Sequence, residues 1–234
     1  MIELQNATVL VTGATGNMGP YMTDQLVNSG ADVVGTYVTE ASRKDIENRA
    51  KHADAVSYYQ VDLTDQAAVE AFAEMVIDDH GAVDHIVGLA GGFSMGGVSD
   101  TDGAAFQAAL NRHAVTAFLT VKVFADHLSE HSGVVLFSSD RAIEPVGGTL
   151  AYDVGKGAVR TLTESLDVEL EARINAIAPF LIDVPANREA MPDADFSEWT
   201  APEAIADEVL HLLSNEGVTG QIVQMTGGQP DVGV

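Results

Sequence analysis

Residues 7–19 read Ala-Thr-Val-Leu-Val-Thr-Gly-Ala-Thr-Gly-Asn-Met-Gly, so a short apolar run leads directly into glycines at positions 13, 16 and 19. The run is continuous and rich in valine, as is typical of a parallel strand buried on both faces. The tight turn that follows needs residues without a Cβ atom, and the sequence after it is helical through Asn28. The start of such a helix offers free backbone N–H groups and a positive dipole end to a pyrophosphate.

The glycine pattern alone is also compatible with an ordinary strand-to-helix turn, because turns use glycine for many purposes. Its position at the first strand–helix junction is the context that dinucleotide binding requires. A phosphate loop of the nucleotide-hydrolase type needs Gly-Lys followed by Ser or Thr, and the chain contains none. We therefore expect cofactor contacts from this loop, namely from Gly13, Thr15, Gly16, Asn17, Met18 and Gly19.

Six further runs of strand length alternate with helical segments along the chain. The runs are residues 31–37, 56–61, 83–90, 133–137, 173–178 and 221–225, and the longest helical segments are residues 65–80, 102–132 and 150–171. This alternation predicts an α/β fold, a Rossmann-like doubly wound parallel sheet of about seven strands with helices on both faces. We expect one domain over residues 1–234. The irregular stretch at about 180–200 is predicted to be a short substrate lid over the carboxyl ends of the strands.

The charge balance is strongly acidic, with 35 Asp and Glu against 11 Lys and Arg and a formal net charge of −24. We therefore expect no binding to nucleic acid or to anionic membrane surfaces, because both need a basic footprint on the protein. The hydrophobic fraction of 46% predicts a folded chain, and the absence of cysteine excludes disulfides and cysteine-ligated metal. We expect a cytoplasmic protein without a signal peptide or membrane span. The charge favours a halophilic origin, with a mesophilic acidic enzyme as the alternative.

The end of the second strand and that of the third are candidates for the adenosine contacts. Tyr37 stands where NAD-binding enzymes usually place an acid for the ribose 2′-hydroxyl. Arg43 and Lys44 follow at the expected start of a helix, so NADP is permitted as well as NAD, although a solvated helix start explains both residues equally well. Asp62 is placed to reach the adenine or, alternatively, to cap the next turn.

Tyr152 and Lys156 form the strongest candidate for chemistry. Their i, i+4 spacing in a predicted helix puts phenol and ammonium on one face. Reduction of a carbonyl by hydride needs a proton donor at the developing alkoxide, and a tyrosine with a pKa near 10 is a weak one at neutral pH. A neighbouring ammonium is expected to lower that pKa by stabilising the phenolate.

The glycine turn together with Asn111, Ser139, Tyr152 and Lys156 resembles the cofactor loop and catalytic tetrad of the short-chain dehydrogenase/reductase family, over essentially the whole chain. The resemblance implies a tyrosine acid/base, a lysine that also binds the nicotinamide ribose, a serine that positions the substrate oxygen and an asparagine that supports a proton relay. It also implies further cofactor contacts, at Leu63, Ala90, Gly91, Pro179 and Ile182, and a homodimer or homotetramer.

The chain departs from the family pattern at several positions. Gly88-Leu89-Ala90-Gly91-Gly92 replaces the usual Asn-Asn-Ala-Gly, Phe180 follows Pro179 where glycine is usual, and Val184 replaces a threonine that often contacts the carboxamide. We expect the first change to affect stability more than chemistry, and the other two to leave the nicotinamide dependent on backbone contacts near Ile182.

Two segments, residues 90–97 and 187–200, are similar to the dihydropteridine reductases within this family. Members of that branch reduce a quinonoid pterin and lack the catalytic serine, whereas Ser139 is present here. The shared segment is also explained by a structural lid or a subunit contact. An apolar pocket wall is a further hypothesis, built from Phe93, Met95, Phe180 and Trp199.

The expected function is therefore a metal-free, NAD- or NADP-dependent oxidoreductase that acts on a small carbonyl or alcohol substrate. The alternatives are reduction of a quinonoid pterin and a non-catalytic dinucleotide sensor or scaffold. His127 and His131 share a predicted helix face, but no third ligand accompanies them, which favours a solvated helix end over a metal site.

Overall fold

The computed structural model describes residues 4–227, and at its centre lies a seven-stranded sheet with the order β3-β2-β1-β4-β5-β6-β7. All neighbouring strands are parallel. The strands are β1 (Thr8–Thr12), β2 (Asp32–Tyr37), β3 (Val56–Gln60), β4 (His85–Gly88), β5 (Gly133–Phe137), β6 (Arg173–Pro179) and β7 (Ile222–Met225). The direction of winding reverses between β1 and β4, which confirms the predicted Rossmann-like doubly wound fold.

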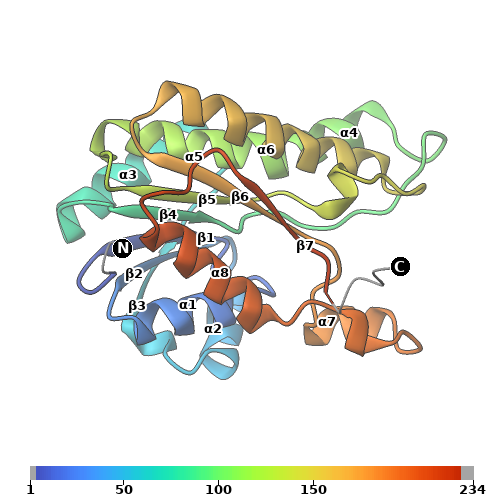
Figure 1. Cartoon of the computed structure of the whole chain (residues 1–234), viewed down its shortest axis with the longest axis horizontal. Helices are drawn as coiled ribbons and strands as arrows, with labels where there is room; N and C mark the ends of the chain where they lie inside the picture. The colour runs from blue at the N-terminus through green and yellow to red at the C-terminus, as the bar shows by residue number, and fades with distance from the viewer. Residues whose placement is uncertain (1–3, 228–234) are drawn as a thin grey trace.

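Helices cover both faces of the sheet (Figure 1). One face carries α3 (Gln66–His80), α4 (Gly103–Leu110), α5 (Thr116–Phe124) and α6 (Leu150–Glu169), and the other carries α1 (Gly19–Asn28), α2 (Glu40–Arg49) and α8 (Pro202–Ser214). The short helix α7 (Pro185–Ala190) lies beyond the carboxyl end of β6. Single 3-10 turns occupy Ala53–Ala55, Ala125–His127, Asp140–Ala142 and Phe196–Glu198.

The core lies in two layers because side chains alternate between the faces of each strand. On β1, Leu10 packs with the helices of the α3, α5 and α6 layer, while Val9 and Val11 pack with α1 and α8. Phe72 and Phe124 meet edge to face at 6.2 Å between α3 and α5. Both layers leave the carboxyl ends of the strands uncovered by the main helices, and a ligand can reach the sheet there.

The helical segment expected over residues 102–132 is more varied than the pattern indicates. It consists of α4, a π-helical turn η2 (Asn111–Val115), α5 and a 3-10 turn that ends at His127. Leu128 has an extended backbone, so the helical face proposed for His127 and His131 does not exist. The π turn widens the helix at Asn111, and such turns are frequent at functional sites.

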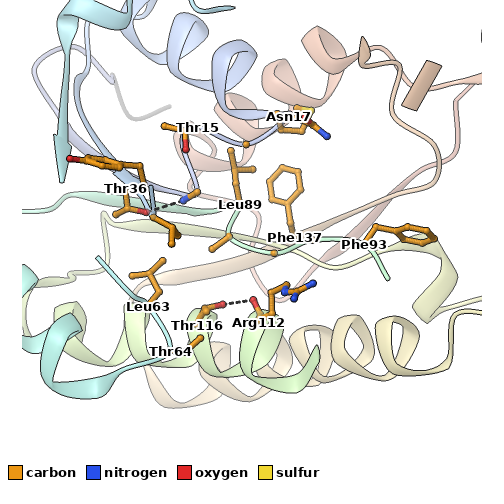
Figure 2. A pocket seen from close by; sticks show the side chains of 18 of the residues that line it. Thr15, Asn17, Thr36, Leu63, Thr64, Leu89, Phe93, Arg112, Thr116 and Phe137 are labelled. Carbon is orange, nitrogen blue, oxygen red and sulfur yellow. Dashed lines mark hydrogen bonds between the residues drawn. The ribbon is translucent and has the colours of Figure 1, made fainter. Parts of the chain in front are cut away.

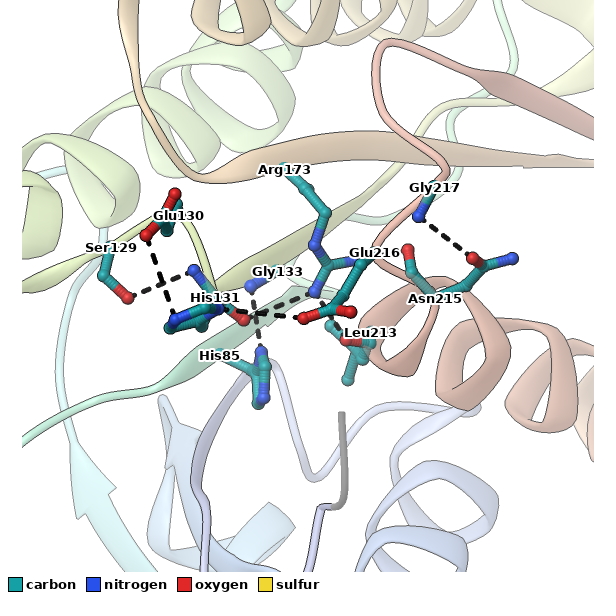
Figure 3. A network of polar contacts seen from close by, with 10 residues as sticks. All are labelled: His85, Ser129, Glu130, His131, Gly133, Arg173, Leu213, Asn215, Glu216 and Gly217. Carbon is teal, nitrogen blue, oxygen red and sulfur yellow. Dashed lines mark hydrogen bonds and ion pairs between the residues drawn. The ribbon is translucent and has the colours of Figure 1, made fainter. Parts of the chain in front are cut away.

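A buried arginine ties the amino end of β6 to the end of α8 (Figure 3). Arg173 donates hydrogen bonds to the carbonyl oxygens of Leu212, Leu213 and Asn215, at 2.7, 2.7 and 3.0 Å, so it caps the last turn of α8. Close by, His85 Nδ1 accepts a 2.9 Å hydrogen bond from the Gly133 amide. Burial lowers the pKa of His85 to about 4, so the ring is neutral and its role is structural.

Within residues 4–227, no helix is both long enough and apolar enough to cross a membrane. The predicted domain of residues 1–234 extends beyond the described residues at both ends.

Candidate active site

A cavity of about 880 Å³ lies at the carboxyl ends of the strands. The glycine loop borders it on one side, and Arg112 and Thr116 border it on the other (Figure 2). It occupies the point where the strand order reverses, which is the usual ligand site of such sheets. Every predicted site residue lines this cavity except Gly19 and Ser139.

The glycine loop is held in a shape that larger residues could not adopt. Gly13 has a φ of +64°, and a Cβ atom there would lie 3.0 Å from the backbone of Ala90. Gly19 lies outside the cavity because it packs under the loop, where a Cβ atom would stand 1.8 Å from the carbonyl oxygen of Ala14. The Gly13 amide donates to Thr36 Oγ1 at 2.9 Å, which joins the loop to β2 (Figure 2).

The loop also fits a pyrophosphate chemically. Among the described residues, the amides of Asn17 and Met18 donate no hydrogen bond, and α1 starts without a side-chain cap. Free N–H donors at a helix start attract phosphate oxygens. Arg49 supports the loop from behind with a 2.9 Å hydrogen bond to the carbonyl oxygen of Gly16. Arg49 could not be predicted from the sequence, because its contact joins two segments that are far apart in the chain.

Tyr37 and Arg43, which are expected near the adenosine, both contact neighbouring side chains of this protein. The Tyr37 hydroxyl donates to Glu40 Oε1 at 2.9 Å. Arg43 lies 4.3 Å over the ring of Tyr58 and pairs with Glu47 at 3.1 Å. A carboxylate therefore stands at the end of β2, while the nearest arginine is held by other partners.

Asp62 lines the cavity and caps the next turn, and its contact with the adenine stays a prediction. Its Oδ1 accepts hydrogen bonds from the amide and hydroxyl of Thr64 at 2.9 and 2.6 Å, which hold the pKa of Asp62 below its usual value.

Tyr152 lies in the first turn of α6, and its ring packs between two other aromatic rings. Phe93 and His113 contact it edge to face, at centroid distances of 5.1 and 5.5 Å. Burial raises the pKa of Tyr152, while a hydrogen bond with Ser139 and the charge of Arg141 act in the opposite direction. The net effect is a raised pKa of Tyr152. The prediction that the lysine ammonium lowers this pKa is therefore wrong, because burial of the ring has the largest effect.

Lys156 is fully buried beside the tyrosine. Its Nζ donates a 2.7 Å hydrogen bond to the carbonyl oxygen of Phe137, the last residue of β5. Burial lowers the pKa of Lys156 to about 8, because a charged amine is poorly solvated there. The side chain is thus a cation at neutral pH, and it loses that charge in mild alkali.

Ser139 and Asn111 both lie near Tyr152 or the cavity, and their catalytic roles stay predictions. Ser139 is buried directly after β5, close enough to Tyr152 to counteract part of the rise in its pKa. Asn111 begins the π turn and lines the cavity, and its Oδ1 accepts a 2.9 Å hydrogen bond from Gln107. Tyr152, Lys156, Ser139 and Asn111 come from α6, the end of β5 and η2, so only the tertiary fold brings them together.

Of the aromatic residues considered for an apolar wall, only Phe93 lines the cavity. Trp199 is buried against Phe196 at 4.8 Å, so its proposed place in the wall is wrong. Phe180 and Met95 are exposed. Arg112 lines the cavity instead, and it makes no ion pair within the described residues.

The departures from the family pattern have structural explanations. A Cβ atom on Gly88 would lie 2.8 Å from Leu136 Cδ2, so Leu136 fills the space of the missing asparagine. Val184 is buried in the core layer of α1 and α8 and does not line the cavity. Pro179 and Ile182 do line it, as expected.

Within residues 180–200, the expected lid, most of the side-chain contacts join residues of the same segment. Asp183 and Arg188 form an ion pair, and the Arg188 guanidinium lies 4.7 Å over the ring of Phe196. The Thr200 amide donates to the carbonyl oxygen of Leu181 at 2.8 Å. No residue of 187–200 lines the cavity. The segment shared with dihydropteridine reductases thus makes structural contacts here.

The comparisons with known proteins agree with this site. The family model described as enoyl-(acyl carrier protein) reductase matches residues 13–229. The chain therefore belongs to the short-chain dehydrogenase/reductase family, a family of NAD(P)-dependent oxidoreductases. The family resemblance and the enzyme class predicted from the sequence are confirmed at this level.

Its relatives have diverse activities. The chain is 29% identical to a short chain dehydrogenase/reductase of Aspergillus versicolor, over 92% of this chain and 78% of that protein. It is 24% identical to the 3-oxoacyl-(acyl-carrier-protein) reductase of Thermotoga maritima, over 97% of this chain and 99% of the other.

Solved structures share the fold. An NAD⁺-bound xylitol dehydrogenase superposes with a TM-score of 0.86 at 21% identity, over 97% of this chain and all of that one. A blue fluorescent protein from a metagenomic library, in complex with NADPH, also gives 0.86, at 23% identity over 97% and 99% of the two chains.

Proposed function

We propose that this chain transfers a hydride between a nicotinamide dinucleotide, NAD or NADP, and a small carbonyl or alcohol substrate, with Tyr152 as acid/base. The observation that carries the proposal is the meeting of Tyr152 and Lys156 at a cavity that the glycine loop also borders, with Ser139 buried close to the phenol. When bound, the nicotinamide supplies or accepts the hydride.

The residues around the substrate oxygen have complementary tasks. The raised pKa keeps Tyr152 protonated at neutral pH, so it can donate a proton to an oxygen that becomes an alkoxide. The Ser139 hydroxyl lies next to the phenol and orients the same oxygen. Lys156 contributes a positive charge below about pH 8, which stabilises the phenolate that remains after the donation.

The end of β2 supports NAD over NADP. Glu40, hydrogen-bonded to Tyr37, would repel a 2′-phosphate and can accept a hydrogen bond from a 2′-hydroxyl. Arg43, the cation that a 2′-phosphate would need, stacks on Tyr58 and pairs with Glu47.

Reduction of a quinonoid pterin is less well supported. Of the two segments that suggested it, 187–200 lies away from the cavity, whereas 90–97 borders the cavity through residues 90–93. Ser139, which the pterin reductases lack, is present close to Tyr152. A dinucleotide sensor without catalysis is also disfavoured, because Tyr152 and Lys156 are both in place.

We propose further that the chain forms one domain and works in the cytoplasm at high salt, as a homodimer or homotetramer. The net charge of −24 supports the high-salt setting. Exposed apolar side chains on α5 and α6, namely Phe118, Val154 and Val168, support assembly through these helices. Light scattering after size exclusion tests the assembly, and a monomer at micromolar concentration would contradict it.

The direct test of the function is a binding titration with NADH and NADPH in molar salt, followed by a screen of carbonyls, alcohols and quinonoid pterin. We expect binding of at least one dinucleotide and turnover of a carbonyl or alcohol. Failure to bind either dinucleotide would overturn the proposal, and turnover of the pterin alone would favour the alternative.

A further inference from the structure

His113 is a buried ionisable residue of this site that the proposed chemistry does not use. It lies in the π turn η2, two residues after Asn111, and is only 2% exposed. Its ring stands edge to face against Tyr152, with 85° between the two planes. It is thus in contact with the acid/base of the proposed reaction.

Two glycines make room for the imidazole. A Cβ atom on Gly155, in α6, would lie 2.8 Å from His113 Cδ2. A Cβ atom on Gly91, after β4, would lie 3.1 Å from His113 Nδ1. A side chain at either position would force the ring to move, so His113 and the two glycines form one arrangement.

The Nδ1 atom of His113 is buried and has no hydrogen-bond partner. A native protein rarely leaves such an atom unpaired without a reason. The Cβ position on Gly91 lies 3.1 Å from this nitrogen and 3.5 Å from Lys156 Nζ, so both atoms border the same small gap. Lys156 has three N–H donors, and the Phe137 carbonyl takes one of them.

The imidazole is in the right state to accept a hydrogen bond. Burial, together with the charges of Lys156 and Arg112, lowers the pKa of His113 to about 3, so the ring is neutral. The backbone of Gly92 acts against this shift. A neutral imidazole carries one proton, and Nδ1 offers a lone pair when that proton lies on Nε2.

We propose that His113 is a positioning residue whose Nδ1 is linked to the Lys156 ammonium through one water molecule in the gap at Gly91, with the water donating to Nδ1 and accepting from Nζ. This link holds Lys156 charged and in place beside Tyr152, while the imidazole ring fixes the phenol. Only the consequence for turnover rests on the proposed function, because the contact itself concerns two side chains of this protein.

The charged and titratable groups around this pair come from three elements. Arg112 is contributed by η2, Tyr152 and Asp153 by α6, and Arg141 by the turn after β5. The segment 89–93 after β4 contributes no ionisable side chain. Burial alone lowers the pKa of Lys156, and no carboxylate among the described residues raises it, so the partner available to Nζ is an uncharged acceptor.

The test is the pKa of Lys156, measured by NMR on protein labelled at lysine ¹³Cε, without cofactor or substrate. The chain has only four lysines, and substitution of Lys156 by Arg identifies its signal. We expect a pKa of about 8 in the wild type. Substitution His113→Phe, which keeps a ring but removes the acceptor, should lower the pKa by about one unit.

His113→Asn is the matched rescue, because its Oδ1 takes the place of Nδ1. We expect a Lys156 pKa at or above the wild-type value, although this variant leaves the larger void. If His113 had a role in packing alone, His113→Asn would change the pKa of Lys156 more than His113→Phe does. A Lys156 pKa that is unchanged or raised in His113→Phe would overturn the proposal, and His113→Leu replaces the Phe variant if that one does not fold.

Two further measurements complete the test. His85→Asn alters another buried histidine, whose Nδ1 has its own partner, and should leave the Lys156 pKa unchanged. In the wild type, ¹⁵N histidine spectra should show His113 Nδ1 unprotonated, with a resonance that moves as Lys156 titrates. A protonated Nδ1, or a resonance that does not respond, contradicts the proposal whether or not the protein turns over any substrate.

Discussion

Lys156 donates a 2.7 Å hydrogen bond from Nζ to the carbonyl oxygen of Phe137, which fastens the buried amine of α6 to the end of β5. This is one bond for a group with three donors, and burial lowers the pKa of Lys156 to about 8. The folded protein therefore holds a cation in a place that disfavours its charge. Such a cost is typical of functional sites, where stability and activity oppose each other.

Lys156→Met should stabilise the protein at about pH 7 by the order of 1–3 kcal/mol and abolish turnover. Between about pH 8 and the ordinary pKa of 10.5, the unfolded chain binds a proton that the folded chain does not, so wild-type stability rises with pH through this window. Urea unfolding at several pH values measures both effects, and the advantage of the variant should shrink as the pH rises. Lys122→Met, at an exposed position, is the control. A variant less stable than wild type at neutral pH would contradict the argument.

The buried neutral histidines predict a loss of stability in mild acid. Burial lowers the pKa of His85 to about 4, from an ordinary value of 6.5. As the pH falls through this range, the unfolded chain gains a proton that the folded chain resists, so the free energy of unfolding falls, by the order of 2–3 kcal/mol for this residue. His85→Asn should flatten the dependence, and His131→Asn, at an exposed site, should not. Equal slopes in wild type and His85→Asn would count against this explanation.

Glu40 is predicted to favour NADH over NADPH by about tenfold in dissociation constant at low salt. Its carboxylate stands beside Tyr37, where a 2′-phosphate would lie. Glu40→Gln should strengthen NADPH binding and reduce the preference, while Glu74→Gln, which removes one exposed carboxylate from α3, is the control for the change in net charge. Fluorescence titration measures both constants. Tighter binding of NADPH by the wild type would show that the assignment of this subsite is wrong.

The net charge predicts that salt stabilises the fold. An increase from about 0.1 M to about 1 M NaCl shortens the screening length from about 10 to about 3 Å, which weakens repulsion among the 35 carboxylates. The melting temperature should rise steadily over this range. Sucrose at matched osmolality controls for solvent effects that do not depend on charge. A melting temperature independent of salt would remove the support for a high-salt setting.

The elements that could be predicted from the sequence are those with local signals. All seven strands can be predicted because each is a short run rich in apolar, β-branched or aromatic residues, and Tyr152 and Lys156 can be paired because helical spacing alone puts them together. The prediction of one helical segment over residues 102–132 misses the π turn at Asn111, because such a turn leaves no periodic pattern in the sequence. Helix α8 was not named, although its buried residues Ile205, Val209 and Leu212 recur at helical spacing.

The parts of the site that sequence could not supply depend on distant contacts. The pKa of Tyr152 moves upward because Phe93 and His113, from two other elements, enclose the ring. The place of His113 depends on Gly91 and Gly155, and either glycine alone looks like an ordinary small residue. The burial of Trp199 away from the cavity likewise follows from how the segment after β6 folds back on itself.

The central claim is that Tyr152 exchanges the proton while the dinucleotide is bound elsewhere in the cavity, and Tyr152→Phe tests it most directly. The measurement is kcat on an active carbonyl or alcohol, together with the dissociation constant of the dinucleotide, in wild type and variant at equal salt. The account predicts a fall in kcat of about 10²- to 10⁴-fold, with a dissociation constant that changes little. Unchanged turnover in the variant, with the dinucleotide still bound, would contradict it.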